Sequence, residues 1–270
     1  MPIQVITVDA FTDKPFQGNP AAVCLLEAAI DPRLMQAVAL EMNLSETAFV
    51  LPEEAEGGWR LRWFTPEAEV QLCGHGTLAA AHVLYEQGLV SADGVVVFHT
   101  ASGPLTCVRH ADGDIEMDFP AIPVTPTVAP MELFAALGVP LAYVGASESN
   151  YLVEVEDEAT LRGIRPDLRL LATLPKWGVI VTCRAAAHEG EPDYDFVSRF
   201  FAPAKGVGED PVTGSAHCSL APYWSAKLGR TKLVGFQASK RGGVVRVEDR
   251  GARVTLGGRA VTVMHGMLQV

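Results

Sequence analysis

Residues 62–84 read RWFTPEAEVQLCGHGTLAAAHVL, and this stretch combines strand patterns, a glycine-flanked corner and a helix pattern. Arg62–Phe64 is short and aromatic, which favours a strand, and Glu67–Leu72 alternates polar and apolar residues as a half-buried strand does. A helix is predicted to follow, with Thr77 as its N-cap and Gly88 at its end. The stretch therefore predicts that a strand passes through a tight corner into a helix.

The corner between strand and helix holds a thiol and an imidazole. His75 lies between Gly74 and Gly76, and Cys73 precedes them. Free backbone N–H groups at a helix N-terminus suit an anion such as a carboxylate. An imidazole with a pKa near ~6.5 is a ready acid or base, although His75 can equally hold the turn by hydrogen bonds. Cys73 is either a thiol acidified by the helix N-terminus or a buried, inert side chain.

The same construction occurs again about half the chain length later. Residues 199–229 read RFFAPAKGVGEDPVTGSAHCSLAPYWSAKLG, so that Arg199-Phe-Phe-Ala-Pro answers Arg62-Trp-Phe-Thr-Pro. In this alignment Asp210 takes the position of Cys73, and Gly214-Ser215 opens a second helix. A repeat at half-length predicts two similar lobes, whose helix N-termini are expected to face each other across a cleft.

Composition limits the class of protein and of partner. The chain has 270 residues, 49% of them hydrophobic, with a formal net charge of −11 and a pI of about 5.1. This acidic balance argues against general nucleic-acid binding, which requires a basic face. It still permits a small anionic substrate, because backbone N–H groups supply local positive potential.

The cysteines and the apolar runs indicate a cytoplasmic protein without a membrane span. The chain has 5 cysteines without a paired spacing, which favours reduced thiols in the cytosol. The first residues lack the basic and apolar segments of a signal peptide. No uninterrupted apolar run approaches the ~18 residues that a membrane span requires.

The remaining patterns indicate an α+β protein with two domains. Strand patterns at Ile3–Asp9 and Pro20–Leu26 precede a helix that begins at Asp31-Pro32. A proline-rich stretch, 120–130, reads as the crossing between lobes. We therefore expect an N-terminal lobe of residues 1–120 and a C-terminal lobe of residues 121–270, with the last strands as candidates to return to the first lobe.

Three further polar residues are candidates for a site, each with a plainer alternative. Glu46 lies where a helix pattern gives way to a strand pattern, so it is either partly desolvated, which suits proton transfer, or a surface carboxylate. Asp210 either orients a substrate or simply forms a turn with Pro211. Asn19 either lines a cleft or shapes a tight turn.

Metal binding is not predicted. Cys73 and His75, with His217 and Cys218, do not have the spacing of a structural zinc site. His217 and Cys218 are also adjacent within the predicted second helix, so their side chains point to different faces.

Five motifs occur in order along essentially the whole chain: Asp9-Ala-Phe-Thr with Gly18-Asn-Pro, Asn43-Leu-Ser-Glu-Thr-Ala-Phe, Arg62-Trp-Phe-Thr-Pro, Cys73-Gly-His-Gly-Thr and Glu209-Asp-Pro-Val-Thr-Gly-Ser-Ala. Together they closely resemble the PhzF-like phenazine-biosynthesis isomerases, a family that shares its fold with diaminopimelate epimerase and proline racemase. The resemblance implies two pseudo-symmetric lobes, each a β-rich, barrel-like sheet around a central helix.

The resemblance also implies roles for individual residues. Glu46 corresponds to the proton-shuttling glutamate, and His75 and Asp210 are implied as the other catalytic residues. No cofactor or metal is implied, and family members are commonly homodimers. The residues expected to contact a small-molecule carboxylate substrate are Ser45, Cys73, Gly74, Gly76, Asn19, Gly214 and Ser215, and the role of Cys73 stays open because the phenazine-type mechanism does not need it.

One departure from the related epimerases affects the predicted reaction. Those enzymes use one cysteine from each lobe, and here Asp210 is aligned with the second cysteine. We therefore expect a cofactor-independent isomerase that moves a proton on a small amino or hydroxy acid, with Glu46 as the acid/base. The alternatives are an epimerase or racemase that uses Cys73, and a non-catalytic small-molecule-binding or scaffold protein.

Overall fold

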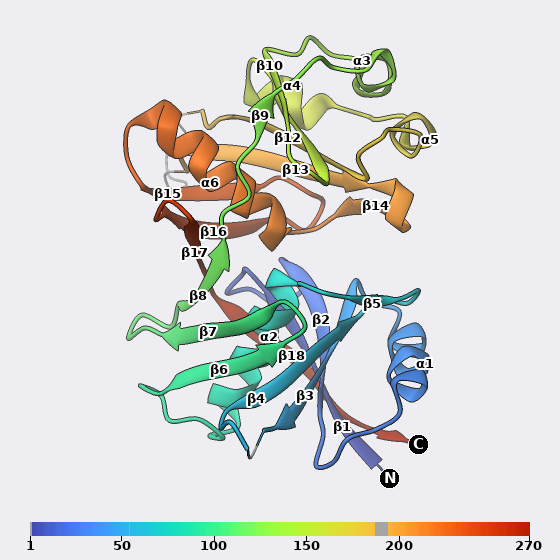
Figure 1. Ribbon diagram of the computed structural model, residues 1–270, viewed down its shortest axis with the longest axis vertical. Coiled ribbons are helices and arrows are strands. Elements are labelled where there is room, and N and C mark those ends of the chain that lie inside the picture. The colour runs from blue at the N-terminus through green and yellow to red at the C-terminus, as the bar shows by residue number, and fades with distance from the viewer. Residues whose placement is uncertain (1, 54, 187–193) are drawn as a thin grey trace. The chain divides into compact units, whose positions relative to one another are not determined.

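A computed structural model describes residues 2–53, 55–186 and 194–270 of the chain, and it divides into two compact units (Figure 1). The first unit comprises Met1–Phe119 and Thr255–Val270, and the second comprises Pro120–Val254. The chain passes between the units twice, within β8 and within β17. The C-terminal strand thus belongs to the unit that contains the N-terminus.

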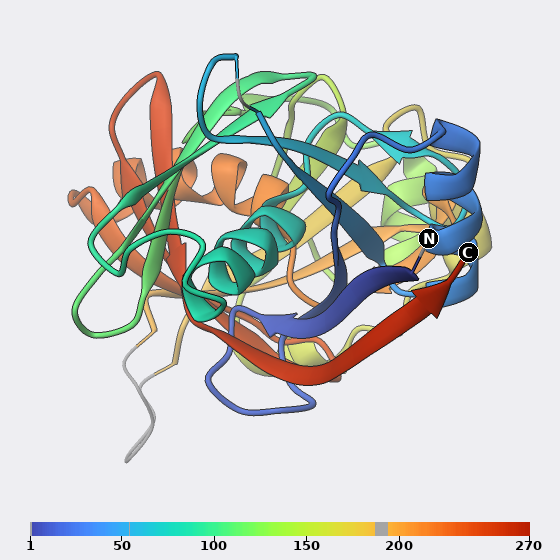
Figure 2. The same ribbon diagram turned by 90° about the horizontal axis from the view of Figure 1, so that it is seen from below.

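The first unit is a sheet of strands with two helices. Its elements are β1 (Pro2–Ala10), β2 (Asn19–Leu25), α1 (Pro32–Met42), β3 (Glu46–Pro52), β4 (Trp59–Phe64), β5 (Glu69–Val70), α2 (Gly74–Glu86), β6 (Val95–Thr100), β7 (Gly103–Arg109), β8 (Ile115–Pro120) and β18 (Ala260–Gln269). Figure 2 shows α2 enclosed by these strands, with β18 running beside β1. The predicted strand at Glu67–Leu72 is correct in place but too long, since only two of its residues form β5.

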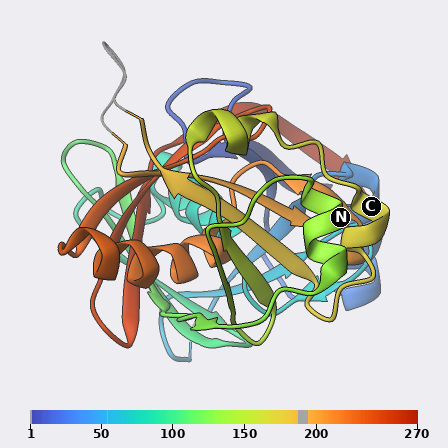
Figure 3. The same ribbon diagram turned by 90° about the horizontal axis from the view of Figure 1, so that it is seen from above.

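The second unit has the same kinds of element. They are β9 (Thr125–Pro126), α3 (Met131–Leu137), β10 (Tyr143–Ala146), β11 (Asn150–Glu154), α4 (Glu158–Gly163), α5 (Leu168–Leu171), β12 (Gly178–Arg184), β13 (Phe196–Ala202), a 3-10 turn (Pro203–Lys205), β14 (Val207–Asp210), α6 (Gly214–Leu228), β15 (Lys232–Gln237) and β16 (Gly243–Asp249). Strand β17 (Arg253–Gly258) begins in this unit and continues into the first. Figure 3 shows α6 on one side of these strands and α3 and α5 on the other.

The order and direction of strand pairing repeat between the units. In the first unit β1–β2 is antiparallel, β2–β3 parallel, β3–β4 antiparallel, β4–β6 parallel and β6–β7 antiparallel. In the second, β10–β11, β11–β12, β12–β13, β13–β15 and β15–β16 follow the same sequence of directions. The predicted α+β fold with two pseudo-symmetric lobes is confirmed.

Local sequence explains where the helices begin and end. The Asp31 side chain accepts a hydrogen bond from the Arg33 N–H at the start of α1, and Asn43 ends this helix in the left-handed conformation. Most residues of α2 are buried, because the strands of the first unit enclose this helix. Pro222 lies within α6 without shortening it. The carbonyl of Cys218, which Pro222 leaves without its helical donor, accepts the Ile122 N–H at 3.0 Å.

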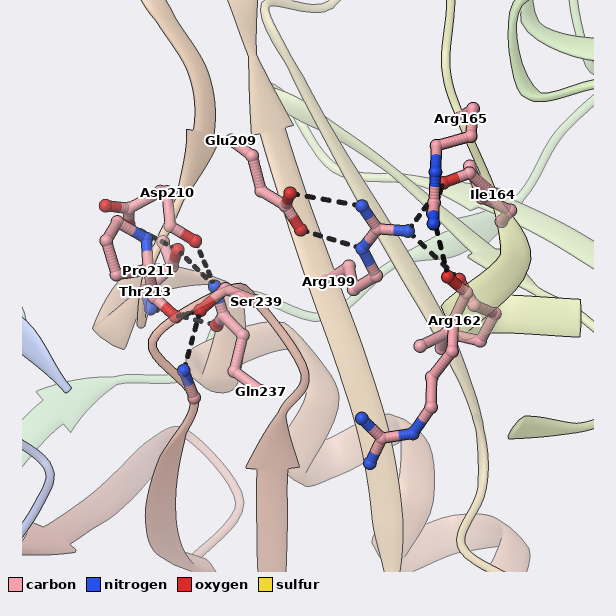
Figure 4. A network of polar contacts seen from close by, with 12 residues as sticks. Arg162, Ile164, Arg165, Arg199, Glu209, Asp210, Pro211, Thr213, Gln237 and Ser239 are labelled. Atoms are coloured by element: carbon pink, nitrogen blue, oxygen red, sulfur yellow. Dashed lines mark hydrogen bonds and ion pairs between the residues drawn. The ribbon is translucent and has the colours of Figure 1, made fainter. Parts of the chain in front are cut away.

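An arginine–glutamate pair occupies the same place in both units. Arg62 of β4 donates two hydrogen bonds of 2.7 Å to Glu69 of β5. Arg199 of β13 donates in the same way to Glu209 of β14, at 2.7 and 3.1 Å (Figure 4). Arg199 is buried and also donates to two carbonyls at the end of α4. The two pairs differ in burial, so their contributions to stability should differ.

We expect Glu209→Gln to destabilise the protein by about 2–3 kcal/mol, because it leaves a buried guanidinium without its counter-charge. The matched variant Glu69→Gln removes a pair that is roughly one-third exposed and should cost under about 1 kcal/mol. Urea unfolding of the two variants measures this difference. An equal loss of unfolding free energy in the two variants would show that burial of Arg199 does not strengthen its pair with Glu209.

His217 is a fully buried imidazole within α6. Its Nδ1 lies 2.8 Å from the Thr213 carbonyl, and its ring packs beside Phe196 of β13. Burial lowers the pKa of His217 to about 4, from an ordinary value of 6.5. The side chain is therefore neutral at pH 7, with Nδ1–H as the donor.

Because the folded protein binds a proton at His217 less readily than the unfolded chain, stability should fall as the pH falls from about 6.5 to about 4. The loss attributable to this group is about 3 kcal/mol. His217→Gln keeps a donor for the Thr213 carbonyl and does not titrate, so the free-energy difference between wild type and variant should change over this pH range. A difference that is independent of pH would contradict a buried neutral His217.

Among the helices of the described residues, none is long and apolar enough to span a membrane.

Candidate functional site

Two of the predicted catalytic residues meet in the first unit. Glu46 begins β3, and His75 is the second residue of α2. Glu46 Oε2 lies 3.0 Å from His75 Nε2, and both side chains are largely shielded from solvent, with 19% and 5% of their surface exposed. The atoms are close enough for an ion pair, although they do not have the alignment of a hydrogen bond.

The other ring nitrogen of His75 faces two further predicted residues. Asn19 Nδ2 lies 3.2 Å from His75 Nδ1, and Cys73 Sγ lies 3.6 Å from it. Asn19 begins β2, whose parallel pairing with β3 brings it beside Glu46 and α2. The structure thus brings together Asn19, Glu46, Cys73 and His75, which come from three separate segments of the sequence.

Charge and burial act in opposite directions on this group. Burial alone lowers the pKa of His75, but negative charge on Cys73 and Glu46 outweighs it, and the pKa is raised well above 6.5. Burial raises the pKa of Cys73, and the charge of Glu46 raises it further. Burial thus disfavours the Cys73 thiolate whose charge would raise the pKa of His75, and we conclude that Cys73 is not an acidified thiol.

Cys73, rather than the predicted Thr77, is the N-cap of α2. Its backbone is extended, and its Sγ accepts the Gly76 N–H at 3.3 Å. Thr77 instead lies in the first turn, where its hydroxyl donates to the Cys73 carbonyl at 2.5 Å. A Cβ at Gly76 would come within 2.8 Å of Trp63 Cδ1, so the second glycine of the corner is required by close packing.

Glu46, Cys73 and His75 also form a group in which one donor atom from each lies within 4.8 Å of the others. The imidazole, however, has Cys73 beside Nδ1 and Glu46 beside Nε2. A metal ion bound to a ring nitrogen would lie about 2 Å from that nitrogen. At Nδ1 the ion would be near Cys73 but not Glu46, and at Nε2 it would be near Glu46 but not Cys73. The group therefore does not fit a shared metal ion.

The second unit holds a separate polar group around Asp210 (Figure 4). The Thr213 hydroxyl donates to Asp210 Oδ2 in a short hydrogen bond. The side-chain amide of Gln237, at the end of β15, bonds to both residues. Thr213 is the N-cap of α6, which begins with Gly214 and the half-buried Ser215.

Strand register corrects the predicted match between Asp210 and Cys73. Trp63 of β4 pairs with Val70 of β5, whereas the corresponding Phe200 of β13 pairs with Asp210 of β14. Asp210 therefore corresponds to Val70. The residue that corresponds to Cys73 is Thr213, because each is the N-cap of its helix.

The same register shows what replaces Glu46 in the second unit. Ala48 pairs with Trp63 and Ile180 pairs with Phe200, so Glu46 corresponds to Gly178, two residues before Ile180. A Cβ at Gly178 would come within 2.1 Å of Asn150 Oδ1, so no side chain fits there without movement. The position that carries the acid in the first unit carries a glycine in the second.

A serine fixes the corner before the helix in each unit. Ser102 Oγ donates to the Gln71 carbonyl at 2.8 Å, and Ser239 Oγ donates to the Pro211 carbonyl at 2.8 Å. Gln71 and Pro211 each lie two residues before the N-cap of the following helix. The corner is therefore attached to the neighbouring hairpin in the same way in both units.

The remaining predicted residues lie near these groups. Ser45 is half-buried directly before β3, and Gly74 and Gly76 are buried in the first turn of α2. Sequence reasoning did not find Gln237 or Thr213. A glutamine at the end of an apolar strand pattern was the available signal, but its burial depends on the pairing of β13 with β15.

All 5 cysteines are buried, and we expect the native protein to react slowly with iodoacetamide at pH 7.5. Burial raises the pKa of Cys24 and Cys218 to about 12, so little thiolate is present. The rate per thiol should be at least about tenfold below that of free cysteine, while the protein in guanidinium should take up one label per cysteine. Mass spectrometry of digested samples measures this, and fast labelling of Cys73 alone would contradict its raised pKa.

Comparisons with known proteins agree with this architecture. The chain is 48% identical to an uncharacterized isomerase of Halalkalibacterium halodurans, with 99% of each chain covered. It matches the crystal structure of a phenazine biosynthesis protein of the PhzF family from Enterococcus faecalis, with a TM-score of 0.92, 39% identity and 100% of each chain covered. A hydroxyproline epimerase of Agrobacterium vitis shares the fold, with a TM-score of 0.64 at 12% identity over 99% of this chain and 92% of that one. Residues 8–266 match the PhzC-PhzF family, described as phenazine biosynthesis-like protein, and the chain belongs to this family.

Proposed function

We propose that this protein is a cofactor-independent isomerase that moves a proton on a small carboxylate, an amino or hydroxy acid with an open or cyclic skeleton. The observation that carries this proposal is the contact of Glu46 with buried His75 at the first turn of α2. A carboxylate beside an imidazole can both accept and return a proton. Relatives that share 48% of their residues with this chain are named isomerases.

The proposed reaction needs only groups of the chain and the substrate. Glu46 accepts a proton from a C–H bond of the substrate, and the electron pair of that bond moves into the substrate's π system. The resulting enolate-like charge is stabilised by backbone N–H groups. Glu46 then returns the proton to a different carbon, which restores the carboxylate and completes the isomerisation. His75 stabilises the ionised form of Glu46 during the cycle.

Polar groups of the second unit are proposed to bind the same class of small carboxylate. Its N–H groups at Gly214 and Ser215 would bind the substrate carboxylate, since a helix N-terminus favours negative charge. Asp210 would orient a substrate ammonium or hydroxyl group. The family resemblance further predicts a homodimer, and the unpaired cysteine spacing predicts a cytoplasmic location.

An epimerase that uses Cys73 is the second candidate, because Cys73 Sγ lies 3.6 Å from His75 Nδ1. In such an enzyme Cys73 would remove or deliver a proton on one face of the substrate carbon. Thr213 is the residue of the second repeat that corresponds to Cys73, so these two positions do not carry a pair of thiols. The raised pKa of Cys73 also disfavours a thiolate base.

We expect wild-type protein in D2O to exchange a C–H hydrogen of at least one member of a panel of amino acids, hydroxy acids and a cyclic dihydro-hydroxyanthranilate, followed by proton NMR. Glu46→Gln keeps the size of the side chain but cannot accept a proton. It should lower the exchange rate by at least about a hundredfold, while the melting temperature stays near that of wild type.

Cys73→Ser is the matched control at the same corner, because a hydroxyl can still accept the Gly76 N–H. The proposed function predicts that this variant retains exchange within about tenfold of wild type. Loss of exchange with Cys73→Ser but not with Glu46→Gln would establish the epimerase instead. Tight binding of a panel compound without any exchange would indicate a binding protein.

A further inference from the structure

Gln237 is a buried amide whose two ends are both bonded to the corner before α6. The side chain is fully buried at the end of β15. Its Oε1 accepts the Thr213 N–H at 2.9 Å, and its Nε2 donates to the Asp210 carbonyl at 2.8 Å and to Thr213 Oγ1 at 3.1 Å (Figure 4). One side chain from a distant strand therefore holds both Asp210 and Thr213.

These bonds determine where the single hydroxyl proton of Thr213 goes. Because Gln237 Nε2 is itself a donor, it occupies a lone pair of Thr213 Oγ1 and leaves that oxygen's proton for another acceptor. The hydroxyl donates to Asp210 Oδ2. The direction of the chain of bonds is thus from Gln237 through Thr213 to Asp210.

Helix α6 also lacks a side-chain cap, since Thr213 Oγ1 lies against Asp210 and Gln237 instead of the first-turn N–H groups. A threonine at the N-cap normally accepts a hydrogen bond from the second or third N–H of the helix. Thr213 occupies the N-cap and makes no such bond. In the first unit, by contrast, Cys73 Sγ accepts the Gly76 N–H. The first turn of α6 therefore keeps donors that a capping threonine would use.

We infer that Gln237 is a positioning residue that keeps the first-turn N–H groups of α6 open for the carboxylate of the substrate, by holding the Thr213 hydroxyl on Asp210. The identity of the occupant rests on the proposed function. The redirection of the hydroxyl rests on the hydrogen bonds of Gln237 alone, so the two can be tested separately.

Gln237→Glu tests the donor role of the amide. The variant keeps the length of the side chain and the acceptor for the Thr213 N–H, but an ionised carboxylate cannot donate to Thr213 Oγ1. The hydroxyl is then expected to rotate and cap α6. Amide hydrogen exchange at Ser215 or Ala216, measured by NMR, should slow by about fivefold, which corresponds to the usual strength of a threonine cap.

The same variant has a pH signature that a merely structural role would not produce. Protonation of the introduced carboxylate restores an O–H donor, so the effect of Gln237→Glu on exchange at Ser215 and Ala216 should shrink as the pH falls. For whichever carboxylate the wild type deuterates, KM should rise by about tenfold at neutral pH, with kcat changed less. A KM that stays at the wild-type value would overturn the link to substrate binding.

The double variant Gln237→Glu with Thr213→Ala is the matched control, because it removes the hydroxyl that is expected to cap. Exchange at Ser215 and Ala216 should return to the wild-type rate. Slow exchange that persists without the hydroxyl would overturn the inference. So would wild-type exchange in Gln237→Glu itself, provided that its melting temperature shows a folded protein.

If Gln237→Glu does not fold, Thr213→Val in the otherwise native chain shows whether the Thr213 hydroxyl caps α6. It keeps the volume of the side chain and removes the hydroxyl. Because that hydroxyl does not cap α6, exchange at Ser215 and Ala216 should stay within about twofold of wild type. Faster exchange would show that the hydroxyl does cap, and would overturn the inference. These measurements need no substrate, so failure of the proposed function leaves them valid.

Discussion

The first-turn N–H groups of a helix need partners, and in this protein each unit places such a helix end directly after a strand corner. The corner is held in the same way in both units: a bidentate arginine–glutamate pair joins the two strands before it, and a serine from the neighbouring hairpin bonds its backbone. What differs is how the helix end is satisfied. Cys73 caps α2 with a weak sulfur acceptor, whereas Thr213 leaves α6 without a side-chain cap.

The two units have thus diverged at their chemistry while keeping their framework. In the first unit Glu46 lies in contact with the buried imidazole of His75. In the second, Gly178 occupies the position of Glu46, and the polar group gathers instead around Asp210. The two corners therefore do not carry equivalent bases at matching positions.

Much of the fold could be predicted because its signals are local. Asp31 begins α1, Gly88 follows α2 in the left-handed conformation, and Gly229 ends α6, each where the sequence indicates. The repeat of Arg62 and Arg199 predicted the two similar lobes. These features depend on neighbours along the chain, so one sequence contains enough information to find them.

The errors arose where long-range pairing decides the outcome. Threonine is a common N-cap residue, so Thr77 was the predicted cap. The extended backbone lies at Cys73 instead, and the helix therefore begins at Gly74. Aligning Asp210 with Cys73 followed the spacing of letters, whereas strand pairing matches Asp210 with Val70. Gln237 could not be recognised from its sequence neighbours, because its partners come from a corner more than twenty residues earlier.

The most direct test of the central claim, that Glu46 and His75 act as one proton-transfer pair, is a double-mutant cycle on kcat/KM for C–H exchange. Glu46→Asp and His75→Asn would be measured singly and together, with melting temperatures as a check on folding. Residues that act on one substrate as a unit lose activity non-additively, so the double variant should lose much less than the product of the two single losses. A double loss equal to that product would contradict the account.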